Sequence, residues 1–221
     1  PSRPVTIGAH MGGDDLLNNH YQLSEALEKA GEVYSEVARE YALLSGRGYK
    51  VLDQYRMEDA EYALFLLNSA GETAVDALRA KGIRAGLIRP NMIRPFPAEE
   101  LRIALKNVKA LLVGERADSY GAQGGNLTHE IRSALQIDPD NKTIILSRIF
   151  GLGGKDFYAD DAAAFFQLAI DAAEQGSAEK PFDYYGYYPG EEKDALAPVI
   201  EPMHGNAFKT GLIQVTQNDE T

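Results

Sequence analysis

The stretch YALFLLNSAGETAVDALRAKGIRAGLIRP, residues 62–90, decides the fold class. It contains two short, continuously apolar runs, 62–67 and 85–90, joined by a segment with helical periodicity that ends at Gly82. Apolar runs that alternate with amphipathic helices are typical of parallel strands that helices cover on both faces. The stretch therefore predicts one strand–helix–strand unit of an α/β sheet.

The same alternation continues along the chain. Further apolar runs cover 110–115 and 143–150, and helical patterns cover 97–108, 126–137 and 159–176. These runs predict an α/β fold, a three-layer sandwich with a mainly parallel sheet, whose topology right-handed crossovers largely fix. In such a sheet the loops at the carboxyl ends of the strands share one edge, and ligands or partners bind there.

Different patterns flank this alternation. Apolar residues three and four apart predict a long leading helix over 22–45 that ends at Gly46 and packs against another element. We expect an irregular N-terminal arm over 1–20 and an α/β domain over 21–176. The tyrosine-rich segment 177–221 is predicted to be an extended tail that wraps a partner.

The composition excludes several classes of function. A net charge of −11 disfavours nucleic-acid binding and anionic membrane surfaces. Without cysteine the chain forms no disulfide and supplies no thiolate to zinc or an iron–sulfur cluster. No apolar run approaches the roughly 20 residues that span a bilayer, so we expect a cytoplasmic protein.

The loop SYGAQGG, residues 119–125, lies between an apolar run and a helical segment, which is the context of a phosphate cradle. It matches neither the dinucleotide fingerprint G-x-G-x-x-G nor the P-loop. Asn126 is a candidate to cap the following helix with its side chain. From the spacing alone, a structural turn that needs glycine is favoured over a cradle.

The loop FGLGGKDF repeats this design at the end of the next apolar run. Its glycines are Gly151, Gly153 and Gly154, and Lys155 is placed to meet an anion. An anion-binding loop and a simple turn with an exposed lysine are equally consistent with the sequence. Because the two strands follow each other, both glycine loops are expected side by side.

Two arginines, Arg89 and Arg94, lie in the proline-rich stretch 88–101. Paired guanidinium groups at a strand end can grip a carboxylate or a phosphate. The favoured interpretation is structural: prolines stiffen the turn, Phe96 packs on the next helix, and one arginine forms a salt bridge to a neighbouring domain.

No catalytic or metal constellation is evident. The stretch GGDDLLNNHY, 12–21, offers carboxylates but is interpreted as a solvated loop rather than a metal site. The four histidines are scattered, and no zinc motif or nucleophile elbow occurs. The chain alone is therefore predicted to be non-catalytic and to bind no metal.

Four stretches, in order, resemble the alpha subunit of 2-oxoacid:ferredoxin oxidoreductases of the pyruvate type. They are YRMEDAEYALFLLNSAGET at 55–73, GIRAGLIRPNMIRPFPAEEL at 82–101, VGERADSYGAQGGNLTHEIRSAL at 113–135 and IFGLGGKDF at 149–157. The resemblance covers roughly residues 5–170.

The resemblance implies the second domain of that subunit, which has the fold of the transketolase C-terminal domain. Such enzymes decarboxylate a 2-oxoacid on thiamine diphosphate with Mg²⁺, transfer the acyl group to coenzyme A and reduce ferredoxin through iron–sulfur clusters. The thiamine site lies between the first alpha domain and the beta subunit, so this chain is expected to bind no cofactor by itself. Expected partners are the first alpha domain and the beta, gamma and delta subunits. The linker-like start at Pro1 is consistent with a fragment or a separately encoded or processed piece.

The sequence departs from the family pattern at conservative positions. Glu115 stands for the usual Asp, Tyr120 for Phe and Lys155 for Arg, while the triplet 91–93 is atypical of the pyruvate group. The tyrosine-rich tail has no match. The resemblance therefore leaves open which 2-oxoacid is the substrate.

Within this resemblance, the glycine loop is expected to be architectural, near a domain and subunit junction. The residues expected in interface or ligand-proximal loops are Arg94, Tyr120, Gly121, Ala122, Gln123, Gly124, Gly125, Asn126, Gly151, Gly153, Gly154, Lys155 and Asp156. Two alternatives remain: a stand-alone module that binds an anion or coenzyme A with the same loops, and the C-terminal domain of a transketolase-like thiamine enzyme.

Overall fold

A computed structural model describes residues 11–67 and 71–187. The helices and strands named below all lie in one structural unit that ends at Tyr185. None of the helices in these described ranges is long and apolar enough to cross a membrane.

The core of the fold is a six-stranded sheet in the order β1-β3-β2-β4-β5-β6. The strands are β1 (Leu52–Tyr55), β2 (Tyr62–Phe65), β3 (Ala85–Pro90), β4 (Ala110–Glu115), β5 (Ile144–Ile149) and β6 (Phe182–Tyr184). β1 runs antiparallel to β3, and every other neighbouring pair is parallel. The predicted mainly parallel α/β sheet is confirmed.

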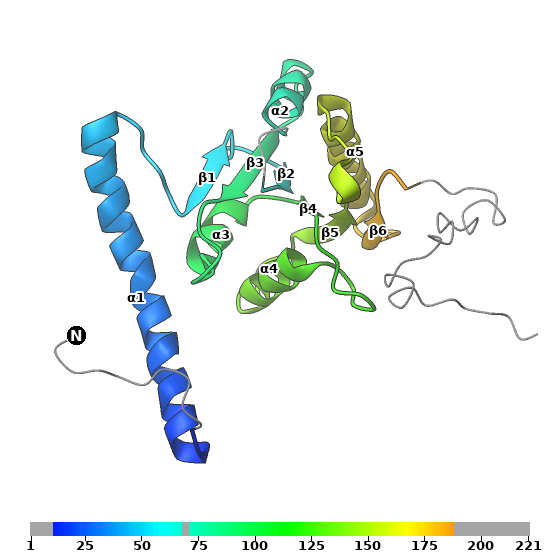
Figure 1. The fold of residues 1–221 in the computed structure, drawn as a ribbon. Helices are drawn as coiled ribbons and strands as arrows, with labels where there is room; N and C mark the ends of the chain where they lie inside the picture. The colour runs from blue at the N-terminus through cyan, green and yellow to red at the C-terminus, as the bar shows by residue number, and fades with distance from the viewer. Residues whose placement is uncertain (1–10, 68–70, 188–221) are drawn as a thin grey trace, which may run out of the picture. The chain divides into compact units, whose positions relative to one another are not determined.

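Helices cover both faces of the sheet (Figure 1). They are α2 (Gly71–Ala80), α3 (Ala98–Leu105), α4 (Asn126–Gln136) and α5 (Ala159–Gln175), with a short 3₁₀ turn η1 (Leu152–Gly154) before α5. One apolar cluster joins the sheet to α3 and α4 through Leu101 and Ile131. The second joins it to α2 and α5 through Val75 and Phe165. The sheet and the helices on its two faces are the three predicted layers, and the two apolar clusters lie between them.

Two strands were not anticipated from the sequence. β1 pairs with β3 at one edge of the sheet, where Asp53 lies opposite Arg89. β6 extends the opposite edge beside β5. Residues 182–184 of the expected extended tail thus form an edge strand of the sheet, while residues 188–221 lie outside the described ranges.

Helix α1 (Gly13–Ser45) starts earlier than the predicted 22–45. The expected irregular arm and solvated loop are wrong from Gly13 onwards, because Asp14 and Asp15 lie in the first turn, where the helix dipole favours carboxylates. The helix ends as predicted, with Gly46 in the left-handed conformation at φ 72°. Residues 1–10 lie outside the described ranges.

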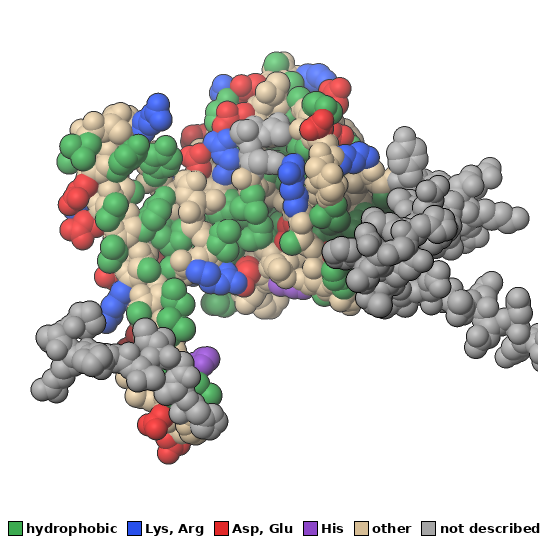
Figure 2. Space-filling view, viewed as in Figure 1, with side chains coloured by type: hydrophobic (Ala, Val, Ile, Leu, Met, Phe, Trp, Pro, Cys, Tyr) green, Lys and Arg blue, Asp and Glu red, His purple; other side chains and the backbone are tan. Residues whose placement is uncertain are grey.

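The expectation that α1 packs closely on another element is not met among residues 11–67 and 71–187. None of its residues is buried, and Leu23, Val37 and Tyr41 of its apolar stripe are exposed. Figure 2 shows hydrophobic side chains along the surface of this helix. Its contacts with the α/β domain include the Tyr34 hydroxyl, which lies 3.4 Å from the Lys50 carbonyl.

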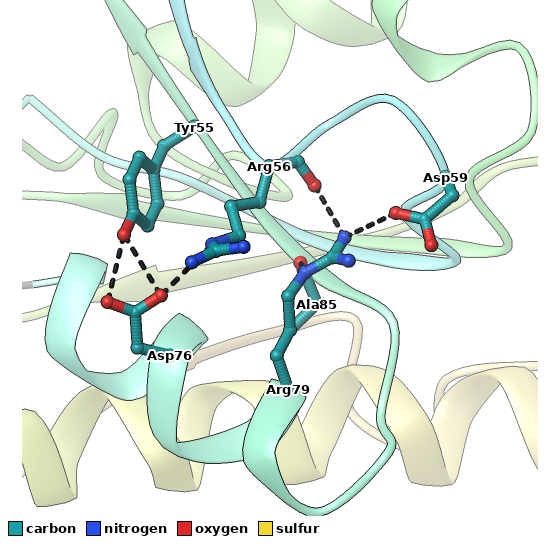
Figure 3. Close-up of polar contacts among 6 residues, drawn as sticks. All are labelled: Tyr55, Arg56, Asp59, Asp76, Arg79 and Ala85. Atoms are coloured by element: carbon teal, nitrogen blue, oxygen red, sulfur yellow. Dashed lines mark hydrogen bonds and ion pairs between the residues drawn. The ribbon is translucent and has the colours of Figure 1, made fainter.

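Side chains of α2 fix the turn between β1 and β2 (Figure 3). Asp76 accepts hydrogen bonds from the Tyr55 hydroxyl at 2.9 Å and from Arg56 Nε at 3.1 Å. Arg79 donates to the carbonyls of Arg56 and Ala85 at 2.6 and 2.7 Å. These bonds hold Arg56 at a φ of 54°, the only positive value among the described non-glycine residues.

Candidate functional site

The carboxyl edge of the sheet is organised around Glu115, the last residue of β4. Its side chain is 2% exposed and accepts the backbone N–H groups of Leu127 at 2.6 Å and Thr128 at 3.1 Å. The Thr128 hydroxyl donates to the same carboxylate at 2.5 Å. The carboxylate therefore caps the first turn of α4 and lies at the positive end of its dipole.

This cap explains the glycine pair in the loop. A Cβ on Gly125 would lie 2.6 Å from the Ala117 carbonyl oxygen and from the Glu115 carboxyl carbon. Gly124 has a φ of 145°, and a Cβ there would lie 2.8 Å from Thr128. The glycines let the loop backbone approach the buried carboxylate closely.

The loop therefore does not fit a phosphate or a diphosphate. Two of the N–H groups that a cradle would offer at the start of α4, those of Leu127 and Thr128, already bind Glu115. The expected cap by Asn126 is also wrong, because Gly125 is the N-cap residue and Asn126 begins the helix. The Asn126 amide oxygen instead accepts the Ser119 hydroxyl at 2.5 Å.

The loop has a buried inner half and an exposed outer half. Gly124 and Gly125 are buried, whereas Tyr120, Gly121, Gln123 and the first residue of α4 are exposed and Ala122 is half-buried. The Tyr120 side chain is 84% exposed. A large aromatic side chain therefore projects from a loop whose base is fixed.

The second glycine loop lies beside the first, as expected. The Arg116 guanidinium, from the first loop, lies 5.5 Å from the centre of the Phe150 ring. A Cβ on Gly151, which has a φ of 65°, would lie 2.9 Å from Arg116 Nε. Arg116 thus connects the two loops through a cation–π contact.

The outer part of the second loop is exposed from Leu152 to Asp156. Gly153 and Gly154 lie in the 3₁₀ turn, and Lys155 and Asp156 follow it. Asp156 accepts the Tyr158 hydroxyl at 2.8 Å. Leu152 and Tyr158 add further exposed apolar surface at this edge.

Both arginines of the proline-rich stretch form ion pairs within the domain. Arg89 pairs with Asp53 at 2.7 Å and also with Glu72, and Arg94 pairs with Glu130 at 2.6 Å. Both arginines are thus paired internally, and a salt bridge from one of them to a neighbouring domain stays a prediction. Phe96 packs on the core cluster below α3, as expected.

The start of the tyrosine-rich tail packs on its own domain. The Tyr184 hydroxyl donates to Asp118, and this bond followed by burial raises the pKa of Tyr184 to about 12. The Tyr185 hydroxyl donates to Asp161 at 2.9 Å, and its ring makes an edge-on contact with Phe165. These two tyrosines therefore contact their own domain, and the wrapping of a partner by the tail stays a prediction.

Sequence reasoning missed the cap and the contacts around it. In the sequence, Glu115 stands out only as a conservative replacement, and no pattern assigns a role to Arg116 or Asp118. The helix after SYGAQGG begins without Ser, Thr or Asp beside its first residue, which was a signal that another group caps it. Within the described residues, no group of three or more His, Cys, Asp or Glu side chains could hold a metal.

Comparison with known proteins identifies the family. Residues 60–162 match pyruvate:ferredoxin oxidoreductase core domain II. The chain is 33% identical over 189 residues to pyruvate synthase subunit PorA of Pyrococcus abyssi, covering 84% of this chain and 47% of that one. It is 32% identical over 186 residues to ketoisovalerate oxidoreductase subunit VorA of Pyrococcus horikoshii, covering 82% and 47%.

Among solved structures, a split-gene transketolase in an inactive beta4 tetramer is similar at a TM-score of 0.41 and 17% identity, covering 57% of this chain and 45% of that one.

The chain is homologous to the alpha subunits of 2-oxoacid:ferredoxin oxidoreductases. Within that family, residues 60–162 are core domain II. The chain spans about half the length of the curated relatives it matches.

Proposed function

We propose that this chain is a structural and interface component of a thiamine-diphosphate-dependent 2-oxoacid:ferredoxin oxidoreductase. The complete enzyme would convert pyruvate or a related 2-oxoacid to acyl-CoA and CO₂ while reducing ferredoxin. Its catalytic site, with thiamine diphosphate, Mg²⁺ and iron–sulfur clusters, would lie on other domains and subunits.

One observation carries this proposal. The carboxyl edge of the sheet, where an open α/β domain ordinarily binds a ligand, is filled by the chain's own Glu115 carboxylate. The same edge presents Tyr120, Leu152 and Tyr158 to solvent. An edge whose interior is filled by a side chain of the same chain, and whose surface exposes aromatic and aliphatic side chains, is suited to a protein partner.

The geometry of the loops supports an interface role. Glu115 fixes the base of the loop 120–126, and Arg116 links it to the loop 151–156. Side chains on pre-ordered loops lose little conformational freedom when they bind, so they make efficient contacts. Arg94 lies close to this edge through its ion pair with Glu130 of α4.

The proposed partners are the first alpha domain and the beta, gamma and delta subunits, in a cytoplasmic complex. Coenzyme A and ferredoxin would interact with the complex rather than with this chain. The relatives include subunits named for pyruvate and for ketoisovalerate at nearly equal identity. We therefore propose 2-oxoacids as the substrate class.

Anaerobic isolation of the native complex through a tag on this chain tests the proposal. Iron, thiamine diphosphate and coenzyme-A-dependent viologen reduction would be measured with pyruvate, ketoisovalerate and other 2-oxoacids. Co-purification of both cofactors with turnover of one acid is the expected result. A chain isolated alone, without iron and thiamine, would contradict it.

The same preparation separates the alternatives. A thiamine-containing complex without iron would favour a transketolase-like enzyme. Calorimetric titration of the isolated chain with coenzyme A would detect a stand-alone binding module. We expect no saturable heat, because the N–H groups of Leu127 and Thr128 at the start of α4 are already bonded to Glu115.

A further inference from the structure

A cavity of about 570 Å³ lies under the C-terminal half of α5, against β5 and β6. Leu146 and Arg148 of β5 line its base, and Leu168 and Ala172 of α5 line its wall. Its volume falls in the range of roughly 300–1,000 Å³ that is usual for small-molecule sites. The interface loops proposed above do not contribute to its lining.

Arg148 is the notable charged group in this cavity, because its residue is only 5% exposed. Its Nη1 donates to the Ser147 carbonyl at 2.8 Å. No carboxylate of the described ranges lies within ion-pair distance of its guanidinium. Burial lowers the pKa of Arg148, while the charge of Asp183 acts in the opposite direction.

The nearest candidate partner is already engaged elsewhere. Asp183 lies beside Arg148 in the register of β5 and β6. Its carboxylate accepts the backbone N–H of Tyr184 at 2.8 Å and pairs with Lys180 at 3.6 Å. A buried guanidinium that lacks a close carboxylate is costly to the fold, so an anion that enters the cavity would gain binding energy.

The surroundings define the kind of anion. Arg148 presents a planar fork of donors that matches a carboxylate in two parallel hydrogen bonds. Asp171, Glu179 and Asp183 also line the cavity, and they would repel a dianion such as phosphate more strongly than a monoanion. The aliphatic side chains of β5 and α5 suit an apolar body.

We propose that this cavity binds a small monocarboxylate with an apolar body, whose carboxylate pairs with Arg148. The site is built entirely from this chain, so the inference stands independently of the proposed function. The proposal assigns a binding role to Arg148, a buried arginine that takes no part in the proposed interface.

Titration of the ¹⁵N-labelled full chain followed by NMR tests this site. Hexanoate is the probe, hexanamide is its neutral counterpart of similar shape, and inorganic phosphate is the dianionic comparison. Hexanoate is expected to shift the Arg148 Nε–H signal and amides of α5 and β6 in a saturable manner. Hexanamide and phosphate are expected to bind at least ten-fold more weakly.

Substitution separates the guanidinium from the apolar walls. Arg148→Met keeps a long side chain without charge and is expected to weaken hexanoate binding at least ten-fold. Arg47→Met, which removes an exposed arginine after α1, is the matched control and should bind as the unaltered chain does. Equal affinity for hexanoate and hexanamide, absence of saturable shifts, or retained binding by Arg148→Met would overturn the proposal. If Arg148→Met does not fold, the comparison of hexanoate with hexanamide on the unaltered chain still decides.

Discussion

Glu115 determines how the loop between β4 and α4 is built. A carboxylate that accepts two backbone N–H groups and a hydroxyl at a helix N-terminus contributes through hydrogen bonds and through the helix dipole. Because the side chain is buried, loss of its charge leaves donors without an equally strong acceptor. The loop and the first turn of α4 therefore depend on one side chain.

Glu115→Gln is expected to lower the free energy of unfolding by about 1–3 kcal/mol, because an amide accepts these bonds less well and brings its own donors into a site that needs acceptors. Urea denaturation of the isolated chain measures the change. Glu100→Gln, an exposed carboxylate in the first turn of α3, is the matched control and should change stability by less than about 0.5 kcal/mol. Equal effects of the two substitutions would remove the special role of Glu115.

Gly125→Ala tests the close approach of the loop to this carboxylate. The added methyl would lie 2.6 Å from both the Ala117 carbonyl oxygen and a Glu115 carboxylate oxygen, so the backbone must move. A loss of several kcal/mol, about 3 or more, is expected from such overpacking at a buried cap. Gly48→Ala, where a Cβ meets nothing within 4 Å, should be close to neutral in the same denaturation series.

At the scale of secondary-structure elements, the sequence predicts the buried strands best. Residues 85–90 and 110–115 were located to the residue, because a strand buried on both faces is continuously apolar. β1 and β6 escaped prediction because short edge strands are half-exposed and mix polar with apolar residues. Their pairing depends on neighbours distant in the sequence, which local periodicity does not reveal.

The turn between β1 and β2 depends on contacts of the same long-range kind. Arg79 of α2 donates to the carbonyls of Arg56 and Ala85 and pairs with Asp59 at 2.7 Å (Figure 3). Arg79→Ala is expected to cost about 1–3 kcal/mol, because these carbonyls lose a charged donor and the strained Arg56 backbone loses its support. Hydrogen exchange of residues 56–61, compared with that of α4 in the same sample, should rise locally. Uniform exchange along the chain would contradict this account.

Tyr184 of β6 and the adjacent Tyr185 hold this edge to the domain by donating hydrogen bonds to Asp118 and Asp161. Both hydroxyls must stay protonated to donate these bonds. The pKa values of Tyr184 and Tyr185 are raised from 10.0 to about 12, for Tyr184 mainly by the bond to Asp118 and for Tyr185 mainly by burial. Their contribution to stability is therefore fully present below pH 10 and is lost as the pH rises towards 12. Urea midpoints measured from pH 9 to 12 should fall more steeply for the unaltered chain than for Tyr184→Phe/Tyr185→Phe. Parallel curves for the two chains would contradict this linkage.

At the scale of the whole molecule, the two glycine loops show where sequence reasoning ends. The motifs placed the chain in its family, and the alternation of strands and helices placed both loops at one edge. The group that binds the N–H groups at that edge could not be predicted. A glycine motif gives the positions of the glycines but does not say which acceptor binds the N-terminus of the helix. The contacts of Glu115 distinguish a structural turn from a cradle only in three dimensions.

If the proposed interface is correct, a substitution in it weakens association with the other subunits without changing the stability of the domain. Tyr120 is 84% exposed, so Tyr120→Ala should change the unfolding free energy of the isolated chain by less than about 0.5 kcal/mol. If its ring is a central contact of a partner, its loss would cost about 2 kcal/mol of binding, which is a roughly thirty-fold weaker association. Ile103→Ala on α3, also strongly exposed, is the matched control outside the two loops. Anaerobic pull-down of the other subunits at several concentrations, with a thermal melt of each isolated chain, measures both quantities. If the interface lies at the glycine loops, Tyr120→Ala weakens assembly while the domain stays equally stable. Unchanged recovery of the other subunits with Tyr120→Ala, or an equal loss of recovery with Ile103→Ala, would therefore place the interface elsewhere.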